Sequence, residues 1–190
     1  DRVARYLRIF NIPLDRPARN LSAGTKAQLG LTLAMAGNPE LLLLDEPTLG
    51  LDPLHRYQYL QLLLEEAIER EITILIASHD LYQLERMADG IAILHGGRII
   101  VTESLDELKG RIKRIRVGAA PSSALAAALA GLPGVIGVRE EAGGSLLSIV
   151  AAPEELAARL RAMPGVGGVQ VIDLSLEEIF LMLCGGPDSV

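Results

Sequence analysis

The chain has 190 residues, which is enough for one medium-sized domain or two small ones. Apolar residues make up 49% but aromatic residues only 3%, so the core must consist mainly of Leu, Ile, Val and Ala. The net charge of -6 gives no support to nucleic-acid binding, and the single cysteine, Cys184, excludes an intrachain disulfide and fits a reducing compartment.

The sequence shows neither a signal peptide nor a membrane span. Residues 1–10 form a charged amphipathic stretch. Residues 117–138 carry no charge and are long enough to cross a bilayer, but they are mostly Ala and Gly, and Pro121 and Pro133 interrupt them. We therefore expect no direct membrane span, and any spans must come from a partner.

The first half of the chain alternates predicted helices and strands, which indicates an α/β layer with a parallel sheet. The predicted helices lie at residues 1–10, 22–36, 53–70 and 81–88, and a short one begins at the capping box of Ser104 and Glu107. Apolar runs at 41–45 and 72–77 are typical of buried parallel strands. Residues 91–101 predict a hairpin that turns at Gly96-Gly97.

Composition changes near Gly110, where the chain becomes richer in Ala and Gly. Here we predict strands at 111–117, 135–140, 145–150 and 168–173, helices at 122–131 and 154–162, a turn at Gly143-Gly144 and a last helix from Ser175. The phrases LPGVIGV (132–138) and MPGVGGV (163–169) repeat each other, which indicates a doubled βαβ unit of the ferredoxin-like type. The expected domains are residues 1–109 and 110–190.

The basic run RIKRIR at residues 111–116 has two interpretations. It could contact acidic lipid headgroups or a partner. More often such a run is the solvated face of an edge strand, where charges discourage aggregation.

Four short motifs follow one another in the first domain: LSAGT (21–25), LLLLDEP (41–47), LGLD (49–52) and ASHD (77–80). Each alone has an ordinary structural explanation, such as a helix cap, a core strand or a polar turn. Their order and spacing make independent coincidence implausible.

With these motifs, residues 1–108 resemble the ATP-binding cassette (ABC) family. The motifs correspond to its signature motif, Walker B strand, D-loop and switch histidine. Residues 110–190 resemble the small C-terminal domain of ATPase subunits of bacterial ABC-2-type exporters, on the basis of LPGVIGV and SLEEIF (175–180). The expected fold class is α/β: a partial P-loop NTPase core with a parallel sheet, followed by a ferredoxin-like α+β domain.

Three residues lie at or just after the ends of the two predicted parallel strands, where open α/β sheets place ligands. Asp45 is placed to hold Mg²⁺, which prefers oxygen ligands. Glu46 could deprotonate the attacking water, and His79 could reach the γ-phosphate.

Another group of candidates lies at helix N-termini, where free N–H groups and the helix dipole favour phosphate. The resemblance implies that Ser22, Ala23 and Gly24 contact the ATP held by an opposite subunit. It also implies that Asp52 lines the interface between the two subunits.

The sequence departs from the family pattern in several places. Thr25 stands where the family often has Gln, and the Gln-bearing loop of the family is not found. Ala23 replaces the first glycine of a pair, and Gln28 stands where the family usually has Arg. No G-x-x-x-x-G-K-[ST] phosphate loop occurs in these residues. We therefore expect a piece of a longer subunit that by itself neither binds ATP tightly nor hydrolyses it, with an exposed sheet edge or apolar face beside strand 41–44.

The function implied by the resemblance is that of an ATP-binding and ATP-hydrolysing subunit of an exporter, with ATP and Mg²⁺ as cofactors. Its expected partners are a second ATPase subunit and a membrane permease, which would hold it in the cytoplasm on the inner face of the cell membrane. The alternatives are a soluble, non-transport ABC ATPase and a non-catalytic interaction module. The transported substrate cannot be inferred.

Overall fold

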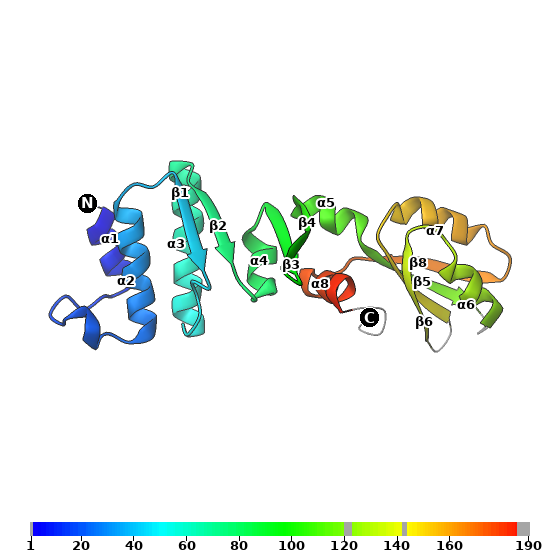
Figure 1. Cartoon of the computed structure of the whole chain (residues 1–190), viewed down its shortest axis with the longest axis horizontal. Coiled ribbons are helices and arrows are strands. Elements are labelled where there is room, and N and C mark those ends of the chain that lie inside the picture. Colours follow the sequence, from blue (N-terminus) through cyan, green and yellow to red (C-terminus); the bar gives the residue numbers. More distant parts are fainter. Residues whose placement is uncertain (1, 120–122, 142–143, 186–190) are drawn as a thin grey trace. The chain divides into compact units, whose positions relative to one another are not determined.

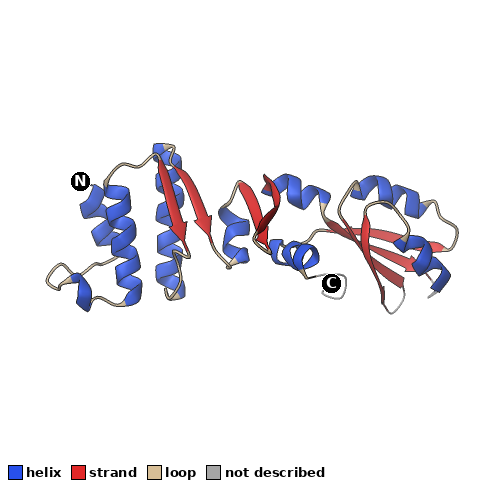
Figure 2. Cartoon of the chain, in the orientation of Figure 1, coloured by secondary structure: helices blue, strands red, loops and turns tan. Residues whose placement is uncertain are grey.

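The computed structural model describes residues 2–119, 123–141 and 144–185. The chain forms two compact units, Asp1–His79 and Asp80–Val190. Figure 1 follows the chain through both units, and Figure 2 shows that each contains helices and strands. The division predicted near Gly110 falls inside the second unit, and a separate domain over 110–190 stays a prediction.

The first unit contains three α-helices and a pair of strands. They are α1 (Arg2–Ile9), α2 (Ala23–Ala36), β1 (Leu41–Asp45), α3 (Pro53–Arg70) and β2 (Thr73–Ala77), with a 3-10 turn at Ala18–Asn20. The strands are parallel, and their register pairs Leu41 with Thr73 and Asp45 with Ala77. All of these helices and strands except the 3-10 turn are at or within a residue of their predicted positions.

Only one face of the β1–β2 pair is covered. Leu42 is buried in the core with residues of all three helices, whereas Leu41, Leu43 and Leu75 are 53%, 65% and 62% exposed. The prediction that these strands are buried on both faces is therefore wrong for this chain. Side chains alternate between faces along a strand, and no described residue covers the second face. The expected exposed apolar face is confirmed.

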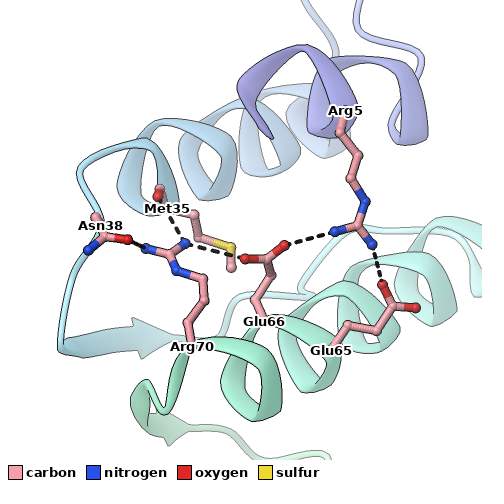
Figure 3. Close-up of polar contacts among 6 residues, drawn as sticks. All are labelled: Arg5, Met35, Asn38, Glu65, Glu66 and Arg70. Atoms are coloured by element: carbon pink, nitrogen blue, oxygen red, sulfur yellow. Dashed lines mark hydrogen bonds and ion pairs between the residues drawn. The ribbon is translucent and has the colours of Figure 1, made fainter. Parts of the chain in front are cut away.

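A buried acid joins the helices of the first unit (Figure 3). Glu66 of α3 is 0% exposed, and its carboxylate accepts hydrogen bonds from Arg5 of α1 at 3.1 Å and from Arg70 at 3.3 Å. Arg70 also donates to the side chain of Asn38 at 2.6 Å, and Arg5 pairs with the half-exposed Glu65 at 2.7 Å. This arrangement satisfies the charge of Glu66 on both oxygens.

The second unit begins with a helix and a hairpin. It continues with α4 (Leu81–Met87), β3 (Gly90–His95), β4 (Arg98–Ser104), α5 (Leu105–Arg111), β5 (Lys113–Ala119), α6 (Ser123–Ala130), β6 (Val135–Glu141), β7 (Gly144–Ile149), α7 (Pro153–Arg161), β8 (Val166–Ile172) and α8 (Leu176–Cys184). The β3–β4 hairpin turns at Gly96 and Gly97, whose positive φ angles of 56° and 76° suit a tight hairpin turn. Both capping boxes, at Ser104 and Ser175, are present as predicted.

The last four strands form one antiparallel sheet in the order β6-β7-β5-β8. Helices α6 and α7 pack on one face, where Ile115, Leu147 and Leu160 are fully buried. This is the ferredoxin-like topology, and the predicted α/β fold class is confirmed. Gly144 begins β7, whereas Gly143 of the predicted turn lies outside the described residues.

The basic run at residues 111–116 differs from its prediction. Arg111 belongs to α5, and β5 lies between β7 and β8, so it is a central strand and not an edge. Lys113 pairs with Asp173, and Arg114 lies 3.2 Å from Glu178. These acids neutralise much of the positive charge that a lipid surface would need.

The helices of the described residues are short or polar. No helix within them has the length and apolar character needed to cross a bilayer. Residues 117–138, the uncharged run, contribute to β5, α6 and β6.

Candidate functional site

Glu46 and His79 meet beyond the carboxyl ends of the two parallel strands. The His79 ring nitrogen Nδ1 lies 2.6 Å from Oε1 of Glu46, and the His79 backbone N–H donates to the same oxygen at 2.8 Å. The hydroxyl of Ser78 donates to Oε2 at 3.2 Å. The structure thus brings together both residues predicted to be catalytic.

The backbone places Glu46 at a sharp turn after β1. Its φ angle is 44°, in the left-handed region that a residue with a side chain seldom adopts. Its N–H donates to the carbonyl of Ala77 at 2.8 Å, which extends the β1–β2 ladder by one bond. Such a conformation costs free energy and persists only where neighbouring contacts hold it, often at functional sites.

The contacts of Glu46 fix its ionisation. The hydrogen bond from the His79 side chain is the main cause that holds the pKa of Glu46 below its usual value. The carboxylate is therefore charged at neutral pH and can accept a proton. A base acts most efficiently when its pKa lies near the working pH. Because the His79 contact lowers the pKa of Glu46, loosening this contact would raise that pKa and make Glu46 a stronger base.

Asp45 is the last residue of β1, and its side chain is exposed. Within the described residues, no group of three or more His, Cys, Asp or Glu side chains is placed to hold a metal ion. Mg²⁺ often binds one or two carboxylates and takes its other ligands from water and phosphate. A single exposed carboxylate fits that mode of binding.

Ser22 is the N-cap of α2. Its hydroxyl accepts a hydrogen bond from the N–H of Thr25 at 3.1 Å and lies 2.8 Å from the Thr25 hydroxyl. The ordinary structural interpretation of LSAGT is therefore also satisfied. Ser22 and Ala23 remain exposed at the N-terminus of this 14-residue helix, where phosphate would be favoured.

Gly24 brings the signature motif against the loop at residues 49–52. A Cβ atom at this position would lie 3.0 Å from a methyl group of Leu51 and 3.7 Å from the carbonyl oxygen of Gly50. A side chain here would push Leu51 aside. Glycine therefore allows close packing between two of the predicted motifs within one chain.

Asp52 caps α3 and contacts a histidine. Its Oδ1 accepts hydrogen bonds from the N–H groups of Leu54 at 3.1 Å and His55 at 3.2 Å, while Oδ2 contacts the His55 ring. The His55 side-chain hydrogen bond, aided by that from its backbone, lowers the pKa of Asp52. Asp52 is thus a charged, exposed group at a helix N-terminus.

The sequence interpretation missed two residues of this region. It gave no role to His55, although the spacing Asp-x-x-His across a helix cap predicts the contact with Asp52. It also gave no role to Ser78. The hydrogen bond of Ser78 to Glu46 depends on the backbone path directly after β2, which ends at Ala77. Gln28, the departure from the family pattern, is 2% exposed, and its Nε2 finds no hydrogen-bond partner among the described residues.

Comparison with known proteins places these motifs in context. Residues 12–85 match the family described as AAA domain, putative AbiEii toxin, Type IV TA system. The chain is 43% identical over 108 residues to the ABC transporter ATP-binding protein YtrB of Bacillus subtilis (strain 168), covering 57% of this chain and 37% of the relative. It is 42% identical over 93 residues to the bacitracin transport ATP-binding protein BcrA of Bacillus licheniformis, covering 49% and 30%.

A longer match includes the second unit. Over 170 residues the chain is 35% identical to the Nod factor export ATP-binding protein I of Rhizobium etli, covering 87% of this chain and 52% of the relative. A solved ATP binding subunit of an ABC transporter superposes with a TM-score of 0.53 at 32% identity, covering 57% of this chain and 46% of that one.

The matched segments thus span 30% to 52% of the length of these three curated relatives. YtrB and the solved structure are named as ABC transporter proteins, and the other two relatives as transport or export ATP-binding proteins, so the recognition of the ABC family from the sequence motifs is confirmed.

Proposed function

We propose that the chain is part of the ATP-binding and ATP-hydrolysing subunit of an ABC exporter. The observation that carries the proposal is the contact between Glu46 and His79, next to Asp45, at the carboxyl ends of β1 and β2. Ligands of open α/β sheets bind at this edge. Phosphoryl transfer needs positioned groups and charge neutralisation, both of which these side chains offer.

Each residue of this group has a separate role in the proposal. Asp45 would hold Mg²⁺, which would neutralise charge at the phosphates when bound. Glu46 orients and deprotonates the attacking water, and His79 contacts the γ-phosphate. Ser78, through its hydrogen bond, positions the Glu46 carboxylate.

The second part of the site comes from another copy of the subunit. Ser22, Ala23 and Gly24 present the N-terminus of α2 to the ATP held by that copy, and Asp52 lines the interface. The exposure of Ser22, Ala23 and Asp52 supports this assignment, because a trans contact needs free surface. The pair of ATPase subunits then binds a membrane permease at the cytoplasmic side, and a relative named for Nod factor export supports the proposed direction.

These 190 residues contain no phosphate-loop motif, so the proposed reaction requires a complete subunit, meaning a chain that carries such a loop in addition. Without it the triphosphate lacks its main cradle of amides and lysine. A non-catalytic scaffold role would need no hydrolytic residues, and the engaged Glu46–His79 pair favours catalysis.

The test is steady-state ATP hydrolysis by the complete subunit. Glu46→Gln is expected to retain ATP binding while turnover falls by roughly 10²–10⁴-fold, the contribution of a positioned base. His79→Ala is expected to slow turnover as well. Glu40→Gln, an exposed acid just before β1, is the matched control. Turnover by Glu46→Gln near that of the control would remove Glu46 from its role.

A further inference from the structure

The four-stranded sheet of the second unit carries a hollow on the face opposite α6 and α7. Its volume is about 300 Å³, and its lining includes Arg116, Gly118, Glu141, Gly144, Gly168 and Gln170. Side chains alternate along a strand, so Ile115 and Val117 enter the core while Arg116 and Gly118 face the hollow. Such a volume lies at the lower end of small-molecule sites.

Three glycines form the floor of the hollow. Gly118 of β5 pairs with Gly144 of β7 on one side and with Gly168 of β8 on the other. The three adjacent strands β7, β5 and β8 therefore all have glycine, with no side chain, at one register position. A ligand above these glycines can approach the backbone directly.

Steric crowding requires glycine at only one of these three positions. A Cβ atom on Gly144 would collide with the carbonyl oxygen of Val117, whereas one on Gly168 would meet nothing within 4 Å and one on Gly118 nothing closer than 3.6 Å. The pairing of β5 with β8 passes from Gly118–Gly168 to Ala119–Val166, so Gly167 has no partner on β5 and forms a β-bulge beside Gly168. Glycine weakens a strand, and in a strand interior it often marks the close approach of a ligand or backbone. The bulge accounts for irregularity at Gly168, while the open space above it leaves the backbone accessible to a ligand.

Arg116 and Glu141 lie at the rim of the hollow and form a weak ion pair. Nε of Arg116 lies 3.6 Å from Oε2 of Glu141, beyond a good hydrogen bond, and the side chains are 53% and 35% exposed. Arg114, two residues earlier on β5, is only 18% exposed and lies 3.2 Å from Glu178. The side chains of Arg116 and Glu141 are thus more accessible to a ligand than that of Arg114.

We propose that this hollow binds a small zwitterion of the α-amino-acid class. Arg116 pairs with the ligand carboxylate and Glu141 with its ammonium group, and the exposed Gln170 amide hydrogen-bonds the ligand at the rim. A simple anion would face the repulsion of Glu141, and a simple cation that of Arg116. The site lies wholly within the second unit and does not depend on nucleotide binding.

Amide NMR spectra of the ¹⁵N-labelled chain test this assignment. The probes are glycine and L-alanine at millimolar concentrations, with acetate and ethylammonium as ligands that carry only one of the two charges. The amino acids are expected to cause saturable shifts at the amides of Gly118, Gly144 and Gly168. Loss of one charge-assisted pair weakens binding by about tenfold or more, so the single-charge probes should bind that much more weakly.

Two valine substitutions separate filling of the hollow from general disturbance of the sheet. Gly168→Val places a side chain in the hollow and is expected to weaken amino-acid binding by about tenfold or more. Gly137→Val alters a strand glycine of β6 outside the hollow lining, where the nearest atom to a Cβ is Ser148 Cβ at 3.9 Å, and should leave binding unchanged. Arg116→Gln, which needs no repacking of the sheet, should also weaken binding about tenfold.

The spectra of all variants report at the same time whether the sheet remains folded. Absence of saturable shifts with either amino acid would overturn the proposal. So would equal affinity for acetate, which would indicate a carboxylate site only, or undiminished binding by both Gly168→Val and Arg116→Gln.

Discussion

Replacement of Glu66 by alanine removes the central anion of the buried cluster in the first unit (Figure 3). In the wild-type chain the Glu66 carboxylate lies between Arg5 and Arg70 and is completely excluded from solvent. The Arg70 side chain is only 7% exposed. Glu66→Ala therefore leaves a guanidinium buried without its counter-charge.

The size of the effect follows from burial. Removal of one partner of a buried ion pair costs about 3–5 kcal/mol, because the remaining charge is neither hydrated nor paired. Arg70 retains its hydrogen bonds to the carbonyl of Met35 and to Asn38, which limit the loss. We expect a destabilisation of about 3 kcal/mol, a large part of the total stability of a small domain.

The assay must report on the first unit alone, since two units need not unfold together. Hydrogen exchange of the α3 amides, followed by mass spectrometry during a urea titration, gives this local stability. Peptides from β5, β7 and β8 serve as an internal reference. In Glu66→Ala the α3 peptides should exchange at much lower urea concentration while the reference peptides remain unchanged.

Glu65→Ala is the matched control for this experiment. Glu65 is the preceding residue of the same helix and pairs with the same Arg5, but its side chain is 50% exposed. Exposed pairs contribute about 0–1 kcal/mol, so this variant should resemble the wild type. Equal, small effects of Glu65→Ala and Glu66→Ala would refute the argument that burial makes the Glu66 cluster important.

Further predictions concern nucleotide binding and pH. Calorimetric titration of the 190-residue chain with Mg-ATP is expected to give no saturable heat at sub-millimolar nucleotide, and micromolar binding would mean that these residues hold phosphate. The hydrogen bond from Arg111 lowers the pKa of Glu103 below its usual 4.5. Its contribution to stability is therefore complete above pH 4.5 and is lost as the pH falls through the folded-state pKa. The urea midpoint of the second unit should decline over that pH range, and Glu103→Gln should make the decline less steep. The same pH profile in Glu103→Gln and the wild type would contradict the role given to Glu103.

Local signals in the sequence located most helices and strands. Asp52, Ser104 and Ser175 cap helices that begin at the next residue, because a cap satisfies backbone N–H groups that the helix leaves free. The start of β5 was less accurate, since Arg111 completes the last turn of α5 and pairs with Glu103 of β4. That pairing depends on tertiary structure and leaves no trace in local periodicity.

Other features depend on register and packing, which a single sequence does not specify. The alignment of Gly118, Gly144 and Gly168 follows from strand pairing across three segments. The burial of Glu66 beside the exposed Glu65 follows from how α1 and α2 pack on α3. In the candidate site the motifs identified Asp45, Glu46 and His79 as candidates. The left-handed conformation of Glu46 could not be predicted from the sequence.

The most direct test of the proposed shared ATP site is the sedimentation of complete subunits in Mg-ATP. Glu46→Gln, which binds nucleotide without consuming it, is expected to sediment as a dimer. Adding Gly24→Asp places a carboxylate against the partner's phosphates and should restore the monomer, whereas Gly24→Asn, of equal size and no charge, should retain most of the dimer. If Glu46→Gln stays monomeric in Mg-ATP, or dimerises equally well with Gly24→Asp, the shared site formed by Glu46 and the α2 N-terminus is contradicted.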